Sequence, residues 1–192
     1  MRRVVVGVMP FNLQSAFTEV WYLAAIAPNV SPDLILSIPG CHVVGVDISD
    51  GALAVASGQN FASEIKKTGA IKPEFIKMDV LDTQQDFAYD KFDLVLSNPP
   101  YIKESEKPEM RSNVLDYEPM SALFVSDEDP LVFYRAIAEW SRKVMRPEGV
   151  GMTEVNECLA HQTEVVFRNA GYNHTEIVKD FYDKNRFVTY HR

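Results

Sequence analysis

The segment Asn98-Pro99-Pro100-Tyr101 carries the clearest chemical signal in the chain. It follows an apolar run, residues 92–97, which indicates a buried strand that the two prolines prevent from continuing. The resulting corner offers a side-chain amide, backbone carbonyls without local partners, and an aromatic face. Such groups can accept both N–H bonds of a planar NH2 group, orient the nitrogen lone pair, and offset the positive charge that grows on nitrogen. The segment therefore predicts methylation of an amide or exocyclic amine nitrogen; the alternative is a proline-rich turn without a function. The predicted catalytic residues are Asn98, Pro99, Pro100 and Tyr101.

An acidic residue, Asp47, ends a second predicted strand, a β-branched run over residues 42–46. In doubly wound folds an acid at such a position accepts hydrogen bonds from ribose hydroxyls. The alternative is a capping role at the next helix, because Ser49 and Asp50 follow directly.

A third strand end, after residues 74–78, carries Asp79 and Val80. A carboxylate there can accept from the exocyclic amine of adenine, while the apolar neighbour packs on the ring. Ligands of doubly wound sheets bind at the carboxyl ends of strands, where Asn98 also falls. The predicted cofactor-binding residues are therefore Asp47, Asp79, Val80 and Asn98.

The elements that position these residues alternate between strand and helix patterns, which predicts a parallel sheet with helices on both faces. We expect an α/β, doubly wound Rossmann-like sheet, mostly parallel, with a C-terminal antiparallel hairpin added at its edge. The long segment between Tyr101 and Asp129 is expected to be a loop, and Pro147-Glu148-Gly149 a turn. The expected strands are 42–46, 74–78, 92–97, 150–155, 175–178 and 186–190, and the expected helices are 51–67, 130–144 and 157–170.

Composition limits the classes of partner. A net charge of -8 over 192 residues argues against binding of nucleic acid through phosphate neutralisation. The four histidines and two cysteines lack the spacing of metal ligands, so no metal is expected. Cys41 and Cys158 are expected to be buried thiols in a reducing compartment, which predicts a cytoplasmic protein. No apolar run has the length of a membrane span, and oligomeric state is not predicted.

At the residues discussed above, the chain resembles the HemK/PrmC-type methyltransferases, which modify a glutamine of peptide chain release factors. The resemblance runs from about Ile38 to Arg192. The tetrapeptide alone is shared with amino-methyltransferases of nucleic acids, whereas the ordered series of matching segments is more specific. The matching segments are 46–49, 52–53, 97–102, 117–119, 122–124, 129–131, 133–135, 154, 156–157, 178–180 and 185–187.

The resemblance implies S-adenosylmethionine as the methyl donor and the glutamine of a release factor's Gly-Gly-Gln loop as the acceptor. It implies that Asp47 binds ribose, that Val80 lies by the adenine, and that residues 98–101 hold the glutamine. Glu154 is interpreted as a half-buried structural carboxylate, with a place in the lining of the pocket as the alternative. Arg186 is interpreted as a stabiliser of the terminal hairpin, with a substrate contact as the alternative.

The chain departs from the family's pattern near its start. The family has a glycine-rich loop about twenty residues before the ribose acid, whereas residues 25–33 contain no glycine. We therefore expect an atypical segment over 1–33, in which residues 4–8 replace the first strand and 13–27 its helix. A methyltransferase domain is expected over 34–192. Two alternatives stay open: an adenine-amino methyltransferase of DNA or RNA, and a catalytically impaired remnant that lacks the donor-binding loop.

Overall fold

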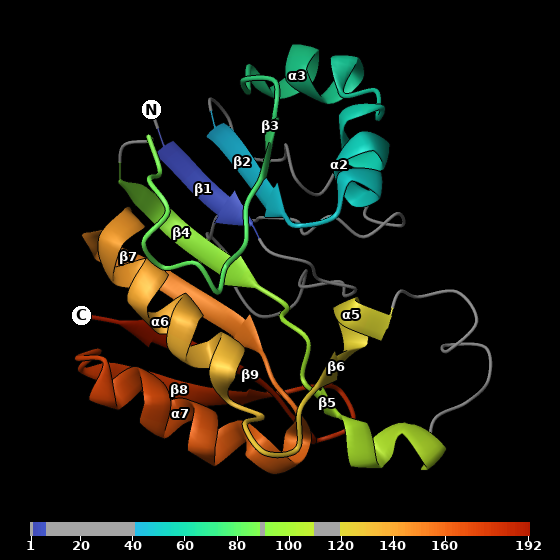
Figure 1. Cartoon of the computed structure of the whole chain (residues 1–192). Coiled ribbons are helices and arrows are strands. Elements are labelled where there is room, and N and C mark those ends of the chain that lie inside the picture. Colours follow the sequence, from blue (N-terminus) through green and yellow to red (C-terminus); the bar gives the residue numbers. More distant parts are fainter. Residues whose placement is uncertain (1, 7–40, 89–90, 110–119) are drawn as a thin grey trace.

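The computed structural model describes residues 2–6, 41–88, 91–109 and 120–192. Its main strands are β1 (Arg2–Val6), β2 (Cys41–Asp47), β3 (Glu74–Lys77), β4 (Phe92–Ser97), β7 (Met145–Glu154), β8 (His174–Lys179) and β9 (Asn185–His191). They form a seven-stranded sheet in the order β3-β2-β1-β4-β7-β9-β8 (Figure 1). Pairing is parallel from β3 to β7, and β9 runs antiparallel to both β7 and β8. The predicted α/β sheet with a C-terminal antiparallel hairpin is confirmed.

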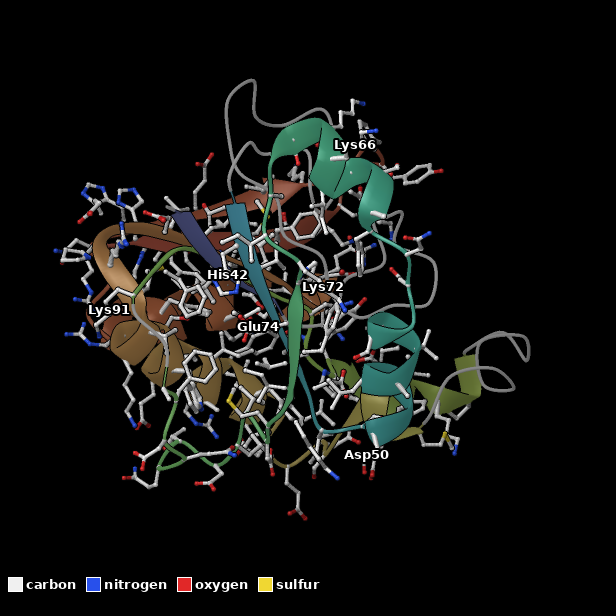
Figure 2. The ribbon with its side chains drawn as sticks, turned by 90° about the horizontal axis from the view of Figure 1, so that it is seen from above. His42, Asp50, Lys66, Lys72, Glu74 and Lys91 are labelled. Carbon is white, nitrogen blue, oxygen red and sulfur yellow. The ribbon has the colours of Figure 1, made fainter. Side chains whose placement is uncertain are left out.

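Helices cover the sheet on both sides. The helices beside the sheet are α2 (Asp50–Ser57), α3 (Ala62–Thr68), α6 (Val132–Val144) and α7 (Ala160–Asn169). The connection from β2 to β3 and the connection from β4 to β7 run in opposite directions along the sheet. Because such crossovers are right-handed, α2 and α6 fall on opposite faces. Figure 1 shows α6 and α7 side by side across the β7–β9 half, and Figure 2 shows α2 and α3 beside β2 and β3.

The packing of each half of the sheet follows from its sequence pattern. In α6 the buried side chains recur at helical spacing, as an amphipathic helix requires. Under α7, the ring of Tyr190 stacks on Phe167 with centroids 3.9 Å apart, and Tyr172 meets it edge-on at 4.9 Å. At the other edge, His42 of β2 bonds Glu74 of β3 at 2.7 Å, and the two side chains point toward one another in Figure 2.

Several helix ends lie where single residues in the sequence predict them. Ser49 is the N-cap of α2, and its hydroxyl accepts the backbone N–H of Ala52 at 3.3 Å. Gly69 ends α3 in the left-handed conformation, with φ 71°. The single helix expected over 51–67 is wrong, because α2 stops at Gly58 and α3 begins at Ala62.

The segment Pro147-Glu148-Gly149 is part of β7, so the predicted turn there is wrong. It lies at an irregularity, because Phe92 pairs with Met145 while Leu94 pairs with Val150. Proline lacks a backbone N–H donor, and a bulge is a place where a strand tolerates that loss.

The expected loop after residue 101 contains regular structure. The pair of short strands β5 (Ile102–Lys103) and β6 (Phe124–Val125) runs parallel, and η1 (Glu104–Glu109) and α5 (Met120–Leu123) lie between them. The backbone N–H of Ser105 donates to the Asp127 carboxylate at 2.9 Å, and this bond connects the two ends of the segment from β5 to β6.

β1 lies between β2 and β4 and pairs in parallel with both. This is the place at which a replacement first strand was expected over residues 4–8. The expected helix over 13–27 and the glycine-free stretch 25–33 lie outside the described residues. The division of the chain at residue 34 stays a prediction. Cys158 is exposed, so the expectation that it is buried is wrong.

Candidate functional site

Asp47 and Asn98 lie at the same level of the sheet's carboxyl edge. Val6 of β1 pairs with Gly45 on one side and with Leu96 on the other. Asp47 and Asn98 each come two residues after these partners, so they flank the end of β1. Two strand spacings separate them, which corresponds to about 10 Å between their backbones.

The Asp47 carboxylate contacts only backbone among the described residues. Its Oδ1 accepts the N–H of Ser49 at 2.7 Å. Burial raises the pKa of Asp47, and the backbone N–H groups of Ser49 and Ile48 act in the opposite direction. Because Ser49 itself caps α2, Asp47 is not the helix cap, and the carboxylate keeps acceptor capacity for a pair of hydroxyl groups.

Asp79 follows β3, and its Oδ1 accepts the N–H of Leu81 at 2.9 Å. Val80 is half-buried and packs against the core. Two apolar side chains beside the acids are unusually exposed: Ile48 at 59% and Leu81 at 42%. Together they give the β2–β3 part of the edge an apolar surface next to two carboxylates. The sequence alone assigned no separate role to these two residues, although Ile48 directly follows Asp47 and Leu81 directly follows Val80.

The Asn98 corner alternates buried and half-buried residues. Ser97 and Pro99 are buried, whereas Asn98 and Pro100 are half-buried. Among the described residues, the Asn98 carboxamide has no hydrogen-bond partner. Within the described part of the chain, the amide predicted to bind the acceptor therefore keeps its hydrogen-bonding capacity.

Tyr101 is fixed to the end of β7 by its side chain and its backbone. Its hydroxyl donates to Glu154 Oε1 at 2.8 Å, and its carbonyl accepts from Asn156 Nδ2 at 3.1 Å. Asn156 Nδ2 also donates to Glu106 at 3.1 Å. Burial raises the pKa of the Tyr101 hydroxyl, and the neighbouring Glu154 raises it further. The hydroxyl is thus a fixed donor, and the half-buried ring packs against the core.

Glu154 is fully buried, with 2% of its surface exposed, so the interpretation of a half-buried carboxylate is wrong. Arg186 Nη1 lies 3.7 Å from its Oε1, and Arg186 Nη2 donates to Asp180 at 3.2 Å. Arg186 therefore contacts both the turn between β8 and β9 and the carboxylate that holds Tyr101. The connection from Tyr101 through Glu154 to Arg186 could not be predicted, because these three residues are far apart in the chain.

Two classes of site have no support in the part of the chain that the structure describes. There, no three His, Cys, Asp or Glu side chains come together as metal ligands. None of the helices over those same residues combines the length and the apolar character that crossing a bilayer requires.

The family model described as "Methyltransferase domain" matches residues 29–188. The chain belongs to this family of methyltransferases. Its relatives include the release factor glutamine methyltransferase of Bacteroides thetaiotaomicron, which is 39% identical over 158 residues, 81% of this chain and 54% of the relative. The enzyme of the same name from Flavobacterium psychrophilum is 34% identical over 159 residues, 83% of this chain and 53% of the relative. The resemblance to HemK/PrmC-type methyltransferases is thereby confirmed, and the chain spans about half the length of these two relatives.

Solved methyltransferase structures share the fold. The catalytic domain of hMettl16 in complex with the MAT2A 3'UTR hairpin aligns with a TM-score of 0.59 at 11% identity, over 99% of this chain and 63% of that one. Aeropyrum pernix fibrillarin with natively bound S-adenosyl-L-methionine aligns with a TM-score of 0.54 at 9% identity, over 98% of this chain and 65% of that one. At these identities the similarity shows a Rossmann-like methyltransferase sheet and no more.

Proposed function

We propose that this methyltransferase transfers a methyl group from S-adenosylmethionine to the side-chain amide nitrogen of a glutamine in a peptide chain release factor, in the cytoplasm. The observation that carries the proposal is the Asn98 carboxamide, which lies at the same edge level as Asp47 and has no hydrogen-bond partner among the described residues. The names of the two bacterial relatives support the choice of glutamine and of release factors.

The described residues fit the donor. The Asp47 carboxylate, which among the described residues accepts only from backbone N–H groups, would accept the ribose hydroxyls. Asp79 would accept from the adenine amine, and the exposed apolar side chains of Ile48 and Leu81, with Val80, suit the adenine ring. When bound, S-adenosylmethionine supplies an electrophilic methyl group on a sulfonium.

The corner at residues 98–101 would bind and orient the acceptor. An amide nitrogen is a poor nucleophile because its lone pair is delocalised into the carbonyl. Asn98 Oδ1 and the Pro99 carbonyl would accept its two N–H bonds, which aims the lone pair and offsets the positive charge that grows on nitrogen. The Tyr101 ring, fixed through its hydroxyl, would pack on the planar amide or face the sulfonium as a cation–π partner. Pro100 keeps the corner rigid.

The charge of the chain supports a protein acceptor over a nucleic acid. A net charge of -8 repels a phosphate backbone, and acceptance of a single glutamine side chain needs no basic groove. An adenine-amino methyltransferase would need both a basic groove and a base-reading module.

The proposal is tested with Asn98→Ala, assayed with a release factor and radiolabelled S-adenosylmethionine. We expect kcat to fall at least about 100-fold, the loss typical of removing one preorganised polar group. Donor affinity, measured by calorimetry, should change less than about threefold. The matched control is Asn173→Ala, an exposed asparagine before β8, which should transfer at the wild-type rate.

Three results would contradict the proposal. Unchanged turnover in Asn98→Ala would refute the role of the corner. Methylation of an oligonucleotide, with none of a release factor, would favour the adenine-amino alternative. No measurable heat at millimolar S-adenosylmethionine would favour the remnant that lacks a donor site.

A further inference from the structure

Glu154 is a buried carboxylate. Its partners all belong to the acceptor side of the site, which is the part around residues 98–101 where the glutamine that accepts the methyl group would bind. It ends β7, and the register that pairs Ser97 with Thr153 places it level with Asn98. Its Oε1 accepts the Tyr101 hydroxyl at 2.8 Å and lies 3.7 Å from Arg186 Nη1. Its Oε2 is buried and has no hydrogen-bond partner among the described residues.

This environment is unfavourable for stability. A buried carboxylate with one unsatisfied oxygen is more costly than an apolar side chain of the same size. Burial accordingly raises the pKa of Glu154, against the opposing influence of Tyr101 and Arg186. An apolar residue would avoid the desolvation of Oε2 but would leave the Tyr101 hydroxyl without its acceptor, so the value of the carboxylate lies in the contacts of Oε1.

The contacts of Glu154 suggest what it does instead. The Tyr101 hydroxyl donates to it, so the ring cannot rotate away from the corner without losing a buried hydrogen bond. Arg186 Nη1 lies 3.7 Å from the same oxygen, and Asp180 accepts two hydrogen bonds of 3.2 and 3.3 Å from Arg186. The orientation of the Tyr101 ring is thus set by a chain of contacts that ends at the turn between β8 and β9.

We propose that Glu154 is a positioning residue for methyl transfer, which fixes the Tyr101 ring beside Asn98 through the hydroxyl and does not touch the substrate. The proposal rests on the proposed function of the corner. It assigns the Tyr101 hydroxyl to anchoring, so the ring face is the part of Tyr101 that acts on the ligand. It also extends the acceptor side of the site to Arg186 and Asp180.

The test compares Glu154→Leu, Glu154→Gln, Tyr101→Phe and the double variant Glu154→Leu/Tyr101→Phe in the release-factor assay. Leucine fills the volume without accepting a hydrogen bond, whereas the glutamine carbonyl can still accept from Tyr101. We expect Glu154→Leu and Tyr101→Phe each to lower kcat about tenfold or more, because a small displacement of a substrate-positioning group is costly. The double variant should be no slower than either single variant, and Glu154→Gln should stay within about threefold of wild type.

A matched control separates positioning from stability. Tyr190→Phe removes another buried hydroxyl contact, the 2.9 Å bond to Ser141, away from the site. It should lower the melting temperature as much as Tyr101→Phe while leaving kcat at the wild-type value. A purely structural Glu154 would instead make activity follow the folded fraction in every variant.

Unchanged kcat in folded Glu154→Leu, or multiplicative losses in the double variant, would overturn this inference and leave the proposed function standing. If Glu154→Leu does not fold, unchanged kcat in Tyr101→Phe overturns the inference on its own. A wild-type chain that binds the donor and modifies no release factor would overturn the proposed function and this inference together.

Discussion

Gly151 of β7 has no room for a side chain, and Gly151→Ala tests how tightly the sheet packs behind the site. Gly151 pairs with Tyr190 of β9. A Cβ at Gly151 would lie 2.6 Å from the Tyr190 hydroxyl oxygen and closer still to two ring carbons. Ordinary contacts between heavy atoms are about 3.5–4.0 Å, so the ring would have to move by about 1 Å or more.

The Tyr190 ring cannot move freely. It is fully buried, stacks on Phe167 at 3.9 Å, and its hydroxyl lies 2.9 Å from Ser141 Oγ. Overpacking of a core costs about 1–3 kcal/mol, and the hydrogen bond adds about 1 kcal/mol if it breaks. The unfolded chain has less conformational entropy with alanine than with glycine, which offsets less than about 1 kcal/mol of this loss of stability. We therefore expect Gly151→Ala to lower the free energy of unfolding by about 2–3 kcal/mol, a large part of the stability of an ordinary domain.

Urea denaturation followed by circular dichroism measures this loss directly. The control is Gly51→Ala in the first turn of α2, where the nearest atom to a Cβ is Ser49 Oγ at 3.7 Å. That substitution should raise stability by about 0.5–1 kcal/mol, because alanine is the better helix former. If Gly151→Ala unfolds within 0.5 kcal/mol of wild type, as a surface substitution would, the packing argument is wrong.

Two further predictions concern the carboxylates. Asp47→Asn should weaken S-adenosylmethionine binding about tenfold or more in calorimetry, because hydrogen bonds to a charged group contribute about 1.5–3 kcal/mol. The control Asp50→Asn removes a carboxylate that forms an exposed ion pair with Lys77, and it should leave donor affinity unchanged. Equal losses of affinity in the two variants would refute the ribose role of Asp47. Burial raises the pKa of folded Glu154, so the native state holds its proton to higher pH than the unfolded chain. Stability of wild type relative to Glu154→Gln should therefore fall as pH rises from about 4 to 8 in urea titrations, and a constant or rising difference would show that Glu154 ionises normally.

Features that depend on neighbours in the sequence could be predicted. The prolines after Asn98 end β4, Ser49 caps α2, and Gly69 ends α3, since each effect acts within a few residues. The split of the expected helix over 51–67 was missed, because helical spacing of apolar residues continues past Gly58 while the chain turns there.

Features that depend on sheet register could not be predicted. The contact of Tyr101 with Glu154 spans 53 residues along the chain. It exists because β7 lies beside β4 and extends one residue past the end of β4, with Ser97 opposite Thr153. A carboxylate after an apolar run has the same local pattern whether it faces solvent or a buried tyrosine. Burial and partner are therefore decided by the neighbouring strands, and the interpretation of Glu154 as half-buried had no local signal to correct it.

The two sides of the candidate site depend on different parts of the chain. The donor side, from Asp47 to Leu81, is formed by two consecutive strands and their ends, so local structure holds it. The acceptor side joins Tyr101 to Glu154 and then to Arg186, which only the antiparallel insertion of β9 beside β7 brings within reach. Damage to the C-terminal hairpin would therefore disorder the acceptor corner while β2 and β3 keep their pairing. Donor binding and methyl transfer are thus separable in this fold, because they depend on different strands.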